Sequence, residues 1–210
     1  MGLIYGTFHY FFTVAYDALF RGEIAGLENI PRTGPFLVAA NHASHLDPPF
    51  IGCHVPRQMA FFARKTLWSS KFSCWFMDGI SSIPVDRDGG SDVKAIKSVL
   101  RTIQSGKAIT LFPEGTRSLD GQLQPAKSGV GMIVCRTQVQ VVPARIFNSH
   151  IAFGRGGGFR FGTRVSIVYG KPLQPADYDD PSAGKERYQV ASEKIMAAIA
   201  ALREPQAVII

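Results

Sequence analysis

The chain has 210 residues, of which 46% are hydrophobic and 19% are charged. This length suits one globular domain, and the composition excludes a disordered chain. The net charge of +7 favours an acidic partner, which could be nucleic acid, an anionic membrane or an acidic substrate. No stretch interleaves basic and aromatic residues in the way of a nucleic-acid module, so we expect no nucleic-acid partner.

The cysteines point to no metal site. Cys53, Cys74 and Cys135 lie far apart and form no CxxC or Cys/His pattern of the kind that binds zinc. We expect three buried thiols in a reducing compartment.

Residues 1–20 are almost wholly apolar or aromatic. They lack the basic start and the cleavage pattern of a signal peptide. A helix of about 20 residues could just cross a bilayer, but His9 and Asp17 would then lie in hydrocarbon at a high cost. One helical stripe is apolar and comprises Phe8, Phe11, Phe12, Ala15 and Leu19. The pattern predicts an interfacial membrane helix, and packing against the domain as ordinary core is the alternative.

Strands and helices alternate along the rest of the chain. Short apolar runs that end at turn-forming residues predict strands at residues 36–40, 109–112, 139–142 and 164–169. Helical spacing predicts helices at 91–105, with Ser91 as N-cap, and at about 185–203. We therefore expect an α/β fold for residues 21–210: a single domain with a mixed, largely parallel sheet flanked by helices. Ligands of such sheets bind beyond the carboxyl ends of the strands.

The first polar stretch after a predicted strand is NHASHLD, residues 41–47. Across a turn, Asp47 can bond one imidazole nitrogen of His42 and leave the other nitrogen free as a base. No serine or cysteine lies in a nucleophile elbow such as GxSxG, so His42 is better suited to activate a substrate hydroxyl. Two alternatives remain open. His42 and Asp47 could only satisfy each other at a helix start, or they could bind a metal with His45, although no fourth ligand is evident.

A second stretch, IPVDR, ends at Arg87 where a loop opens. Arg87 could hold a phosphate with two hydrogen bonds, or it could only pair with Asp86 or Asp88. The residues by themselves favour the ion pair.

The third stretch is FPEGTRS, residues 112–118. Pro113 and Gly115 predict a tight turn, and Thr116 and Arg117 offer hydrogen-bond donors to an anion. The chain contains no Walker A sequence, which argues against a nucleotide-hydrolysing P-loop.

These blocks, in this order and at these separations, resemble the glycerophospholipid acyltransferase family, in particular its 1-acyl-sn-glycerol-3-phosphate acyltransferases. NHASHLD matches the NHxSxxD block, IPVDR the second block, FPEGTRS the third and Val142-Pro143 the fourth. The basic stretch FARK at 62–65 also fits, and the resemblance covers residues 24–172. Ser81 departs from a frequent glycine, and the short N-terminal region leaves room for one membrane helix rather than two.

The resemblance implies a reaction and its two main residues. His42 would take the proton of an acceptor hydroxyl as that hydroxyl attacks the thioester of acyl-CoA or acyl-carrier protein, and Asp47 would orient His42. The acceptor implied is lysophosphatidic acid, which would give phosphatidic acid at the cytoplasmic face of a membrane. Neither a cofactor nor a metal is indicated.

The resemblance also implies the substrate-binding residues. Arg87 and Arg117 would hold the acceptor phosphate, with Lys65 as a weaker candidate and Thr116 beside them. Glu114 would position Arg117 or an acceptor hydroxyl, and Gly115 would lend its backbone amide to the substrate or the oxyanion.

Two other classes of function stay open at this point. One is the same chemistry on another acceptor, such as glycerol 3-phosphate, another lysophospholipid or a lyso-aminolipid. The other is a membrane-surface protein that binds lipid headgroups without turnover.

Overall fold

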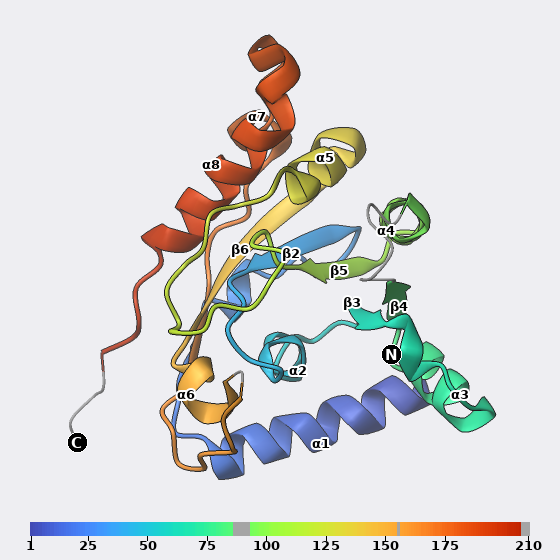
Figure 1. Cartoon of the computed structure of the whole chain (residues 1–210), viewed down its shortest axis with the longest axis vertical. Helices are drawn as coiled ribbons and strands as arrows, with labels where there is room; N and C mark the ends of the chain where they lie inside the picture. The colour runs from blue at the N-terminus through green and yellow to red at the C-terminus, as the bar shows by residue number, and fades with distance from the viewer. Residues whose placement is uncertain (86–92, 155, 207–210) are drawn as a thin grey trace.

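A computed structural model describes residues 1–85, 93–154 and 156–206. Within these residues one seven-stranded sheet crosses the molecule in the order β1-β7-β6-β2-β5-β3-β4 (Figure 1). Neighbouring strands are parallel except β6 and β7, which confirms the mixed, largely parallel sheet. The strands are β1 (Ile24–Ala25), β2 (Phe36–Ala40), β3 (Met59–Arg64), β4 (Ser82–Val85), β5 (Ala108–Leu111), β6 (Gln140–Phe147) and β7 (Ser166–Tyr169).

Helices cover both faces of the sheet. The α-helices are α1 (Leu3–Leu19), α2 (Asp47–Cys53), α3 (Lys71–Gly79), α4 (Val93–Gln104), α5 (Ser128–Thr137), α6 (Ser149–Phe153), α7 (Pro175–Tyr178) and α8 (Arg187–Ala201). Short 3₁₀ turns lie at Leu27–Asn29, Lys65–Leu67 and Pro181–Glu186. In Figure 1, α4, α5 and α8 lie above the sheet, and α1, α2 and α6 lie below it.

Each face of the sheet has its own hydrophobic core, because side chains of a strand alternate between the two faces. In β2, Leu37 and Ala39 belong to the core shared with α4, α5 and α8, whereas Phe36 and Val38 belong to the core shared with α1 and α2. All five residues of β2 are buried. A central parallel strand is expected to have this continuous apolar sequence.

The predicted strand at 139–142 was too short. β6 continues through Pro143 to Phe147. The carbonyl of Pro143 accepts a hydrogen bond from the amide of Gly170, just beyond the end of β7. In a β-strand, the N–H and C=O of one residue point to the same side of the strand. An N–H at position 143 would therefore also point towards the end of β7, so the proline removes no hydrogen bond from the pairing of β6 with β2.

The other predicted elements occur with their ends shifted by one or two residues. The strands predicted at 109–112 and 164–169 are β5 and β7, and the helices predicted at 91–105 and 185–203 are α4 and α8. The expected N-cap Ser91 lies outside the described residues. β3 and β4 were not predicted as strands.

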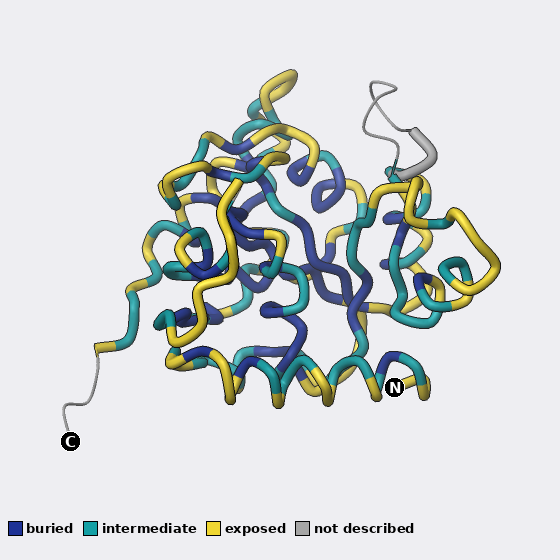
Figure 2. The backbone as a smooth tube through the Cα atoms, turned by 60° about the horizontal axis from the view of Figure 1, so that its bottom comes forward, coloured by how far each residue is buried: buried dark blue, intermediate teal, exposed yellow. Residues whose placement is uncertain are grey.

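Helix α1 lies along one side of the domain and is part of its packing. Tyr5 and Tyr16 are buried. The amide of Met59 donates to the Tyr5 hydroxyl at 3.1 Å, and the Tyr16 hydroxyl donates to the carbonyl of Val165. Figure 2 shows the inward turns of this helix buried or half-buried and the outward residues exposed.

Part of the apolar stripe expected on α1 faces the domain and part of it faces solvent. Phe8 and Phe12 are half-buried, and Phe8 meets Phe76 of α3 with ring centroids 5.6 Å apart. The outward face is nevertheless apolar as well, with Leu3, Tyr10, Phe11 and Val14 exposed. Within the described residues, no helix has the length and hydropathy needed to cross a membrane.

Candidate active site

His42 and Asp47 form a hydrogen-bonded pair at the carboxyl end of β2. The Nδ1 atom of His42 lies 2.8 Å from Oδ2 of Asp47. The same carboxylate oxygen accepts the amides of Ala43 and Ser44 at 2.7 Å each, and the Asp47 side chain is fully buried. An acceptor with three donors is best satisfied as a carboxylate, and it leaves Nε2 of His42 as the free basic nitrogen. The pairing predicted from the sequence is present.

The loop that carries His42 is held by the FPEGTRS stretch, 72 residues away. The amide of His42 donates to Oε1 of Glu114 at 3.3 Å, and the amide of Ser118 donates to the carbonyl of His42 at 2.8 Å. The ring of Phe112 stacks on the imidazole, with centroids 4.1 Å apart and planes 16° apart. These contacts hold the imidazole in one orientation.

Glu114 lies beneath this loop with only 1% of its surface exposed. Burial raises the pKa of its carboxyl to about 7, the hydrogen bond from the His42 amide opposes that rise, and the charge of Asp47 adds to it. Its Oε1 atom supports the backbone of His42, a role that the sequence did not predict. The expectation that Glu114 positions Arg117 or an acceptor hydroxyl stays a prediction.

The variant Glu114→Gln should remove a pH-dependent loss of stability. The pKa is higher in the folded chain, so the unfolded chain ionises first, and the native state is disfavoured as the pH rises from 4.5 towards about 7. At about 1.4 kcal/mol per pKa unit, this difference in pKa lowers the free energy of unfolding by roughly 3 kcal/mol. The side-chain amide of the variant does not ionise and therefore avoids this loss of stability. Urea unfolding at several pH values in this range should show the free energy of unfolding of the variant rising by that amount relative to wild type. A difference between the two proteins that does not change with pH would contradict the raised pKa.

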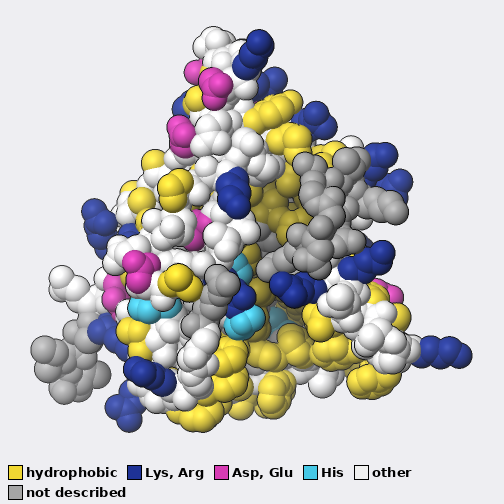
Figure 3. Space-filling view, in the orientation of Figure 1, with side chains coloured by type: hydrophobic (Ala, Val, Ile, Leu, Met, Phe, Trp, Pro, Cys, Tyr) yellow, Lys and Arg dark blue, Asp and Glu magenta, His cyan; other side chains and the backbone are white. Residues whose placement is uncertain are grey.

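A cleft of about 900 Å³ lies in front of His42. Among the described residues, three cations line it from separate elements: Arg64 at the end of β3, Arg117 after β5, and Lys127 at the start of α5. In Figure 3, Lys and Arg side chains gather around the central hollow of this face, where histidine is visible. The cleft therefore combines a histidine base with positive charge that suits a phosphate-bearing substrate.

Gly115 makes the turn that the sequence predicts. Its φ is +66°, in the left-handed region that favours glycine, and a Cβ atom there would lie 3.1 Å from the Lys127 side chain. Its amide, however, donates to the carbonyl of Phe112 at 3.0 Å and closes the turn. In this structure the donor is used within the turn, while Gly115 itself lines the cleft, so a role of this amide towards the substrate or the oxyanion stays a prediction.

The remaining predicted residues fall in different places. Arg87 lies outside the described residues. Lys65 and Thr116 are exposed and are not among the residues that line the cleft. Arg64, the last residue of β3, lines it instead, whereas Lys65 already belongs to the 3₁₀ turn that follows the strand. Sequence reasoning missed Lys127, because the helix that begins just after it, α5, was not predicted either.

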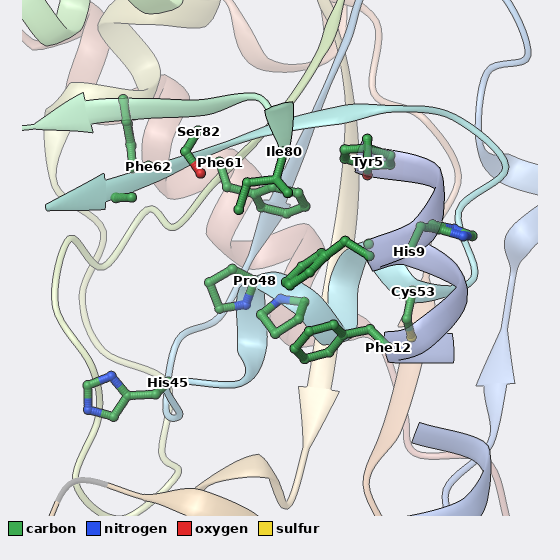
Figure 4. A pocket seen from close by; sticks show the side chains of 14 residues that line it. Tyr5, His9, Phe12, His45, Pro48, Cys53, Phe61, Phe62, Ile80 and Ser82 are labelled. Atoms are coloured by element: carbon green, nitrogen blue, oxygen red, sulfur yellow. The ribbon is translucent and has the colours of Figure 1, made fainter. Parts of the chain in front are cut away.

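A second, apolar pocket of about 170 Å³ adjoins the cleft. His45, Pro48, Phe62 and Ala63 line both spaces. Figure 4 shows Tyr5 and Phe12 of α1 on one side of it and Phe61 and Ile80 on the other. The cleft thus adjoins an aromatic and aliphatic space between α1, α2 and β3. His45 belongs to these walls, and within the described residues no three His, Cys, Asp or Glu side chains come together to hold a metal.

The family model described as Acyltransferase matches residues 21–147, which is more than half of the chain. The chain belongs to the acyltransferase family. The matched region runs from just before β1 to the end of β6 and contains both the His42–Asp47 pair and the FPEGTRS stretch.

Several members of this family with curated names are similar to the chain. The 1-acyl-sn-glycerol-3-phosphate acyltransferase of Bacillus subtilis is 29% identical, over 82% of this chain and 83% of that protein. The chloroplast 1-acyl-sn-glycerol-3-phosphate acyltransferase of Brassica napus is 28% identical, over 82% of this chain and 52% of that protein. The chain spans about half the length of the chloroplast relatives that it matches.

The fold of this acyltransferase-family chain also matches a solved structure. The 1-acyl-sn-glycerophosphate (LPA) acyltransferase PlsC from Thermotoga maritima has a TM-score of 0.74 and 25% sequence identity. The match covers 91% of this chain and 76% of that chain. The family resemblance recognised from the four sequence blocks is therefore confirmed.

Proposed function

We propose that this protein transfers a fatty-acyl group to the free sn-2 hydroxyl of 1-acyl-sn-glycerol 3-phosphate, which gives phosphatidic acid. The observation that carries the proposal is the His42–Asp47 pair at the base of a cleft lined by Arg64, Arg117 and Lys127. The named relatives act on the same acceptor according to their names. Residues 21–210 are proposed as the acyltransferase domain.

The proposed chemistry uses His42 as a general base and then as a general acid. Nε2 takes the proton of the acceptor hydroxyl while its oxygen attacks the thioester carbonyl. Asp47 stabilises the imidazolium that forms. As the tetrahedral intermediate collapses, the C–S bond breaks and the thiolate leaves with the proton from Nε2. No acyl-enzyme is required, and the donor is acyl-CoA or acyl-carrier protein.

The acceptor phosphate is proposed to bind the cations of the cleft. Arg117 can offer two parallel hydrogen bonds to phosphate oxygens, and Lys127 and Arg64 add positive charge around it. Arg87 is retained from the family resemblance as a further candidate. The apolar pocket beside His45 suits an acyl chain, since its walls are mainly aromatic and aliphatic.

We further propose that α1 holds the protein on the cytoplasmic face of a membrane without crossing it. Its inner face packs on the domain, while Leu3, Tyr10, Phe11 and Val14 remain exposed on the outer face. An apolar outer face is unusual for a helix in water and typical of an interfacial one. Flotation with anionic vesicles measures this association, and protein left in the soluble fraction would contradict it.

A panel of acceptors tests the proposed reaction. Purified protein with a labelled acyl donor should acylate 1-acyl-sn-glycerol 3-phosphate faster than glycerol 3-phosphate, other lysophospholipids or lyso-aminolipids. Acyl-CoA and acyl-carrier protein are tried in parallel as donors. Preference for another acceptor would overturn the substrate assignment, and binding of the lipid without product would indicate a headgroup-binding protein.

A further inference from the structure

The exposed large hydrophobic side chains of the described residues gather on three segments. All of them except Leu119 lie on α1 with the residues before it, on α3 with the turn before it, or on α6 with the loop of residues 156–163. Phe72 and Trp75 of α3 are 72% and 57% exposed, and Phe159 and Phe161 of the loop are 54% and 64% exposed. Scattered apolar side chains are normal on a surface, but aromatic ones confined to three segments mark an interaction site.

The three segments adjoin one another, although they are far apart in the sequence. At one end of α1, Phe8 meets Phe76 of α3. At the other end, the amide of Gly162 donates to the carbonyl of Leu19 at 2.7 Å, and the amide of Arg21 donates to that of Thr163 at 3.1 Å. Figures 1 and 2 show α1 running between α3 and the loop. We call the exposed side of these three segments the apolar face.

The loop also connects this face with the active-site cleft. Phe161 stacks on Phe159 at 6.0 Å between centroids, and Phe159 stacks on Phe153 at 4.0 Å with planes 4° apart. Phe153 in turn meets His45 at 5.6 Å, and His45 lines both the cleft and the apolar pocket. A row of rings therefore leads from the surface to the wall of the site.

Cations accompany the exposed aromatic residues of the apolar face. Arg160 stands between Phe159 and Phe161, Lys71 precedes Phe72, and Arg21 follows α1, and all three cations are exposed. Exposed aromatic residues interleaved with lysine and arginine suit the interface of an anionic bilayer, where rings enter the headgroup region and cations meet phosphates. A contact between proteins would instead favour a contiguous apolar centre depleted of charge.

We propose that the loop of residues 156–163 is a second membrane contact, which inserts Phe159 and Phe161 into an anionic bilayer while α1 lies in its interface. Together with α3 at the opposite end of α1, this loop sets the tilt of the domain on the membrane. It thereby keeps His45, in the wall of the site, beside the lipid. This inference rests on the proposed membrane association of α1 and not on the proposed reaction.

The test compares the double variant Phe159→Ser/Phe161→Ser with wild type on vesicles of phosphatidylcholine with and without phosphatidylglycerol. Loss of two inserted rings should weaken vesicle binding by about tenfold or more. Leu119, which is at least as exposed but lies outside the apolar face, gives the matched control, and Leu119→Ser should bind as wild type does. The variant Tyr10→Ser/Phe11→Ser reports the contribution of α1 separately, and thermal unfolding checks that each variant is folded.

Arg160→Glu supplies a second measurement that leaves every ring in place. It should weaken binding to vesicles with phosphatidylglycerol by about tenfold and change binding to neutral vesicles little. The loop contact would be overturned if the double variant and Arg160→Glu both bind vesicles as wild type does while Tyr10→Ser/Phe11→Ser binds them more weakly. That result would leave the proposed membrane contact of α1 standing. Wild type that forms a dimer through this face, dissociated by the double variant, would also overturn it. Acyl transfer to a short-chain acceptor in detergent, assayed separately, reports on the reaction itself.

Discussion

Replacing His42 by alanine should abolish acyl transfer and leave the fold intact. The imidazole lines the cleft, and its 2.8 Å contact with the buried carboxylate of Asp47 leaves Nε2 as the basic nitrogen. Loss of a positioned base costs roughly 10²–10⁴-fold in rate. The measurement is the initial rate of transfer to 1-acyl-sn-glycerol 3-phosphate, together with thermal unfolding.

A histidine outside the cleft gives the control. His54 pairs with Asp17 of α1 at 3.1 Å, and His54→Gln should keep near-wild-type activity. Asp47→Asn should cost a large factor as well, because an amide can misassign the tautomer and no longer supports the imidazolium. His42→Ala with near-wild-type turnover would show that the pair is structural and that the proposed mechanism is wrong.

Replacing Arg117 by alanine should weaken use of the acceptor far more than use of the acyl donor. Arg117 lines the cleft with His42, and a charge-assisted hydrogen bond is worth roughly 10- to 150-fold. We expect the acceptor KM or kcat/KM to change by that factor, while the donor KM stays nearly constant. For Arg117→Lys we expect acceptor constants between those of Arg117→Ala and wild type, since lysine keeps the charge but loses the paired hydrogen bonds.

The comparison for this variant is an exposed arginine away from the cleft. Arg101→Ala on α4 should change neither substrate's kinetics. Equal acceptor constants for Arg117→Ala and wild type would mean that Arg117 serves a structural ion pair and that Lys127, Arg64 or Arg87 holds the phosphate.

Much of the site could be predicted because its central parts are local in the chain. His42 and Asp47 are five residues apart, so one loop and the first turn of α2 bring them together whatever the rest of the fold does. The turn at Gly115 is likewise local, since it is closed by a hydrogen bond to Phe112 three residues earlier. Buried strands such as β2 were recognisable because central parallel strands are apolar on both faces.

The rest depended on contacts between distant segments, which no short stretch of sequence specifies. Glu114 supports the backbone of His42 from 72 residues away, and burial at that place raises its pKa to about 7. The choice of Arg64 over Lys65 depended on where β3 ends, because the strand stops at Arg64 and the chain turns into a 3₁₀ helix at Lys65.

By itself, the sequence determined the alternation of strands and helices, the His42–Asp47 pair, the turn at Gly115 and the family. Only the tertiary structure decided which cations share the cleft, that the Gly115 amide is used within the turn, and which face of α1 stays exposed. It also brought Phe159 and Phe161 to the end of α1, some 140 residues away in the chain. Local backbone preferences act over a few residues, whereas these placements follow from strand order and helix packing across the whole domain.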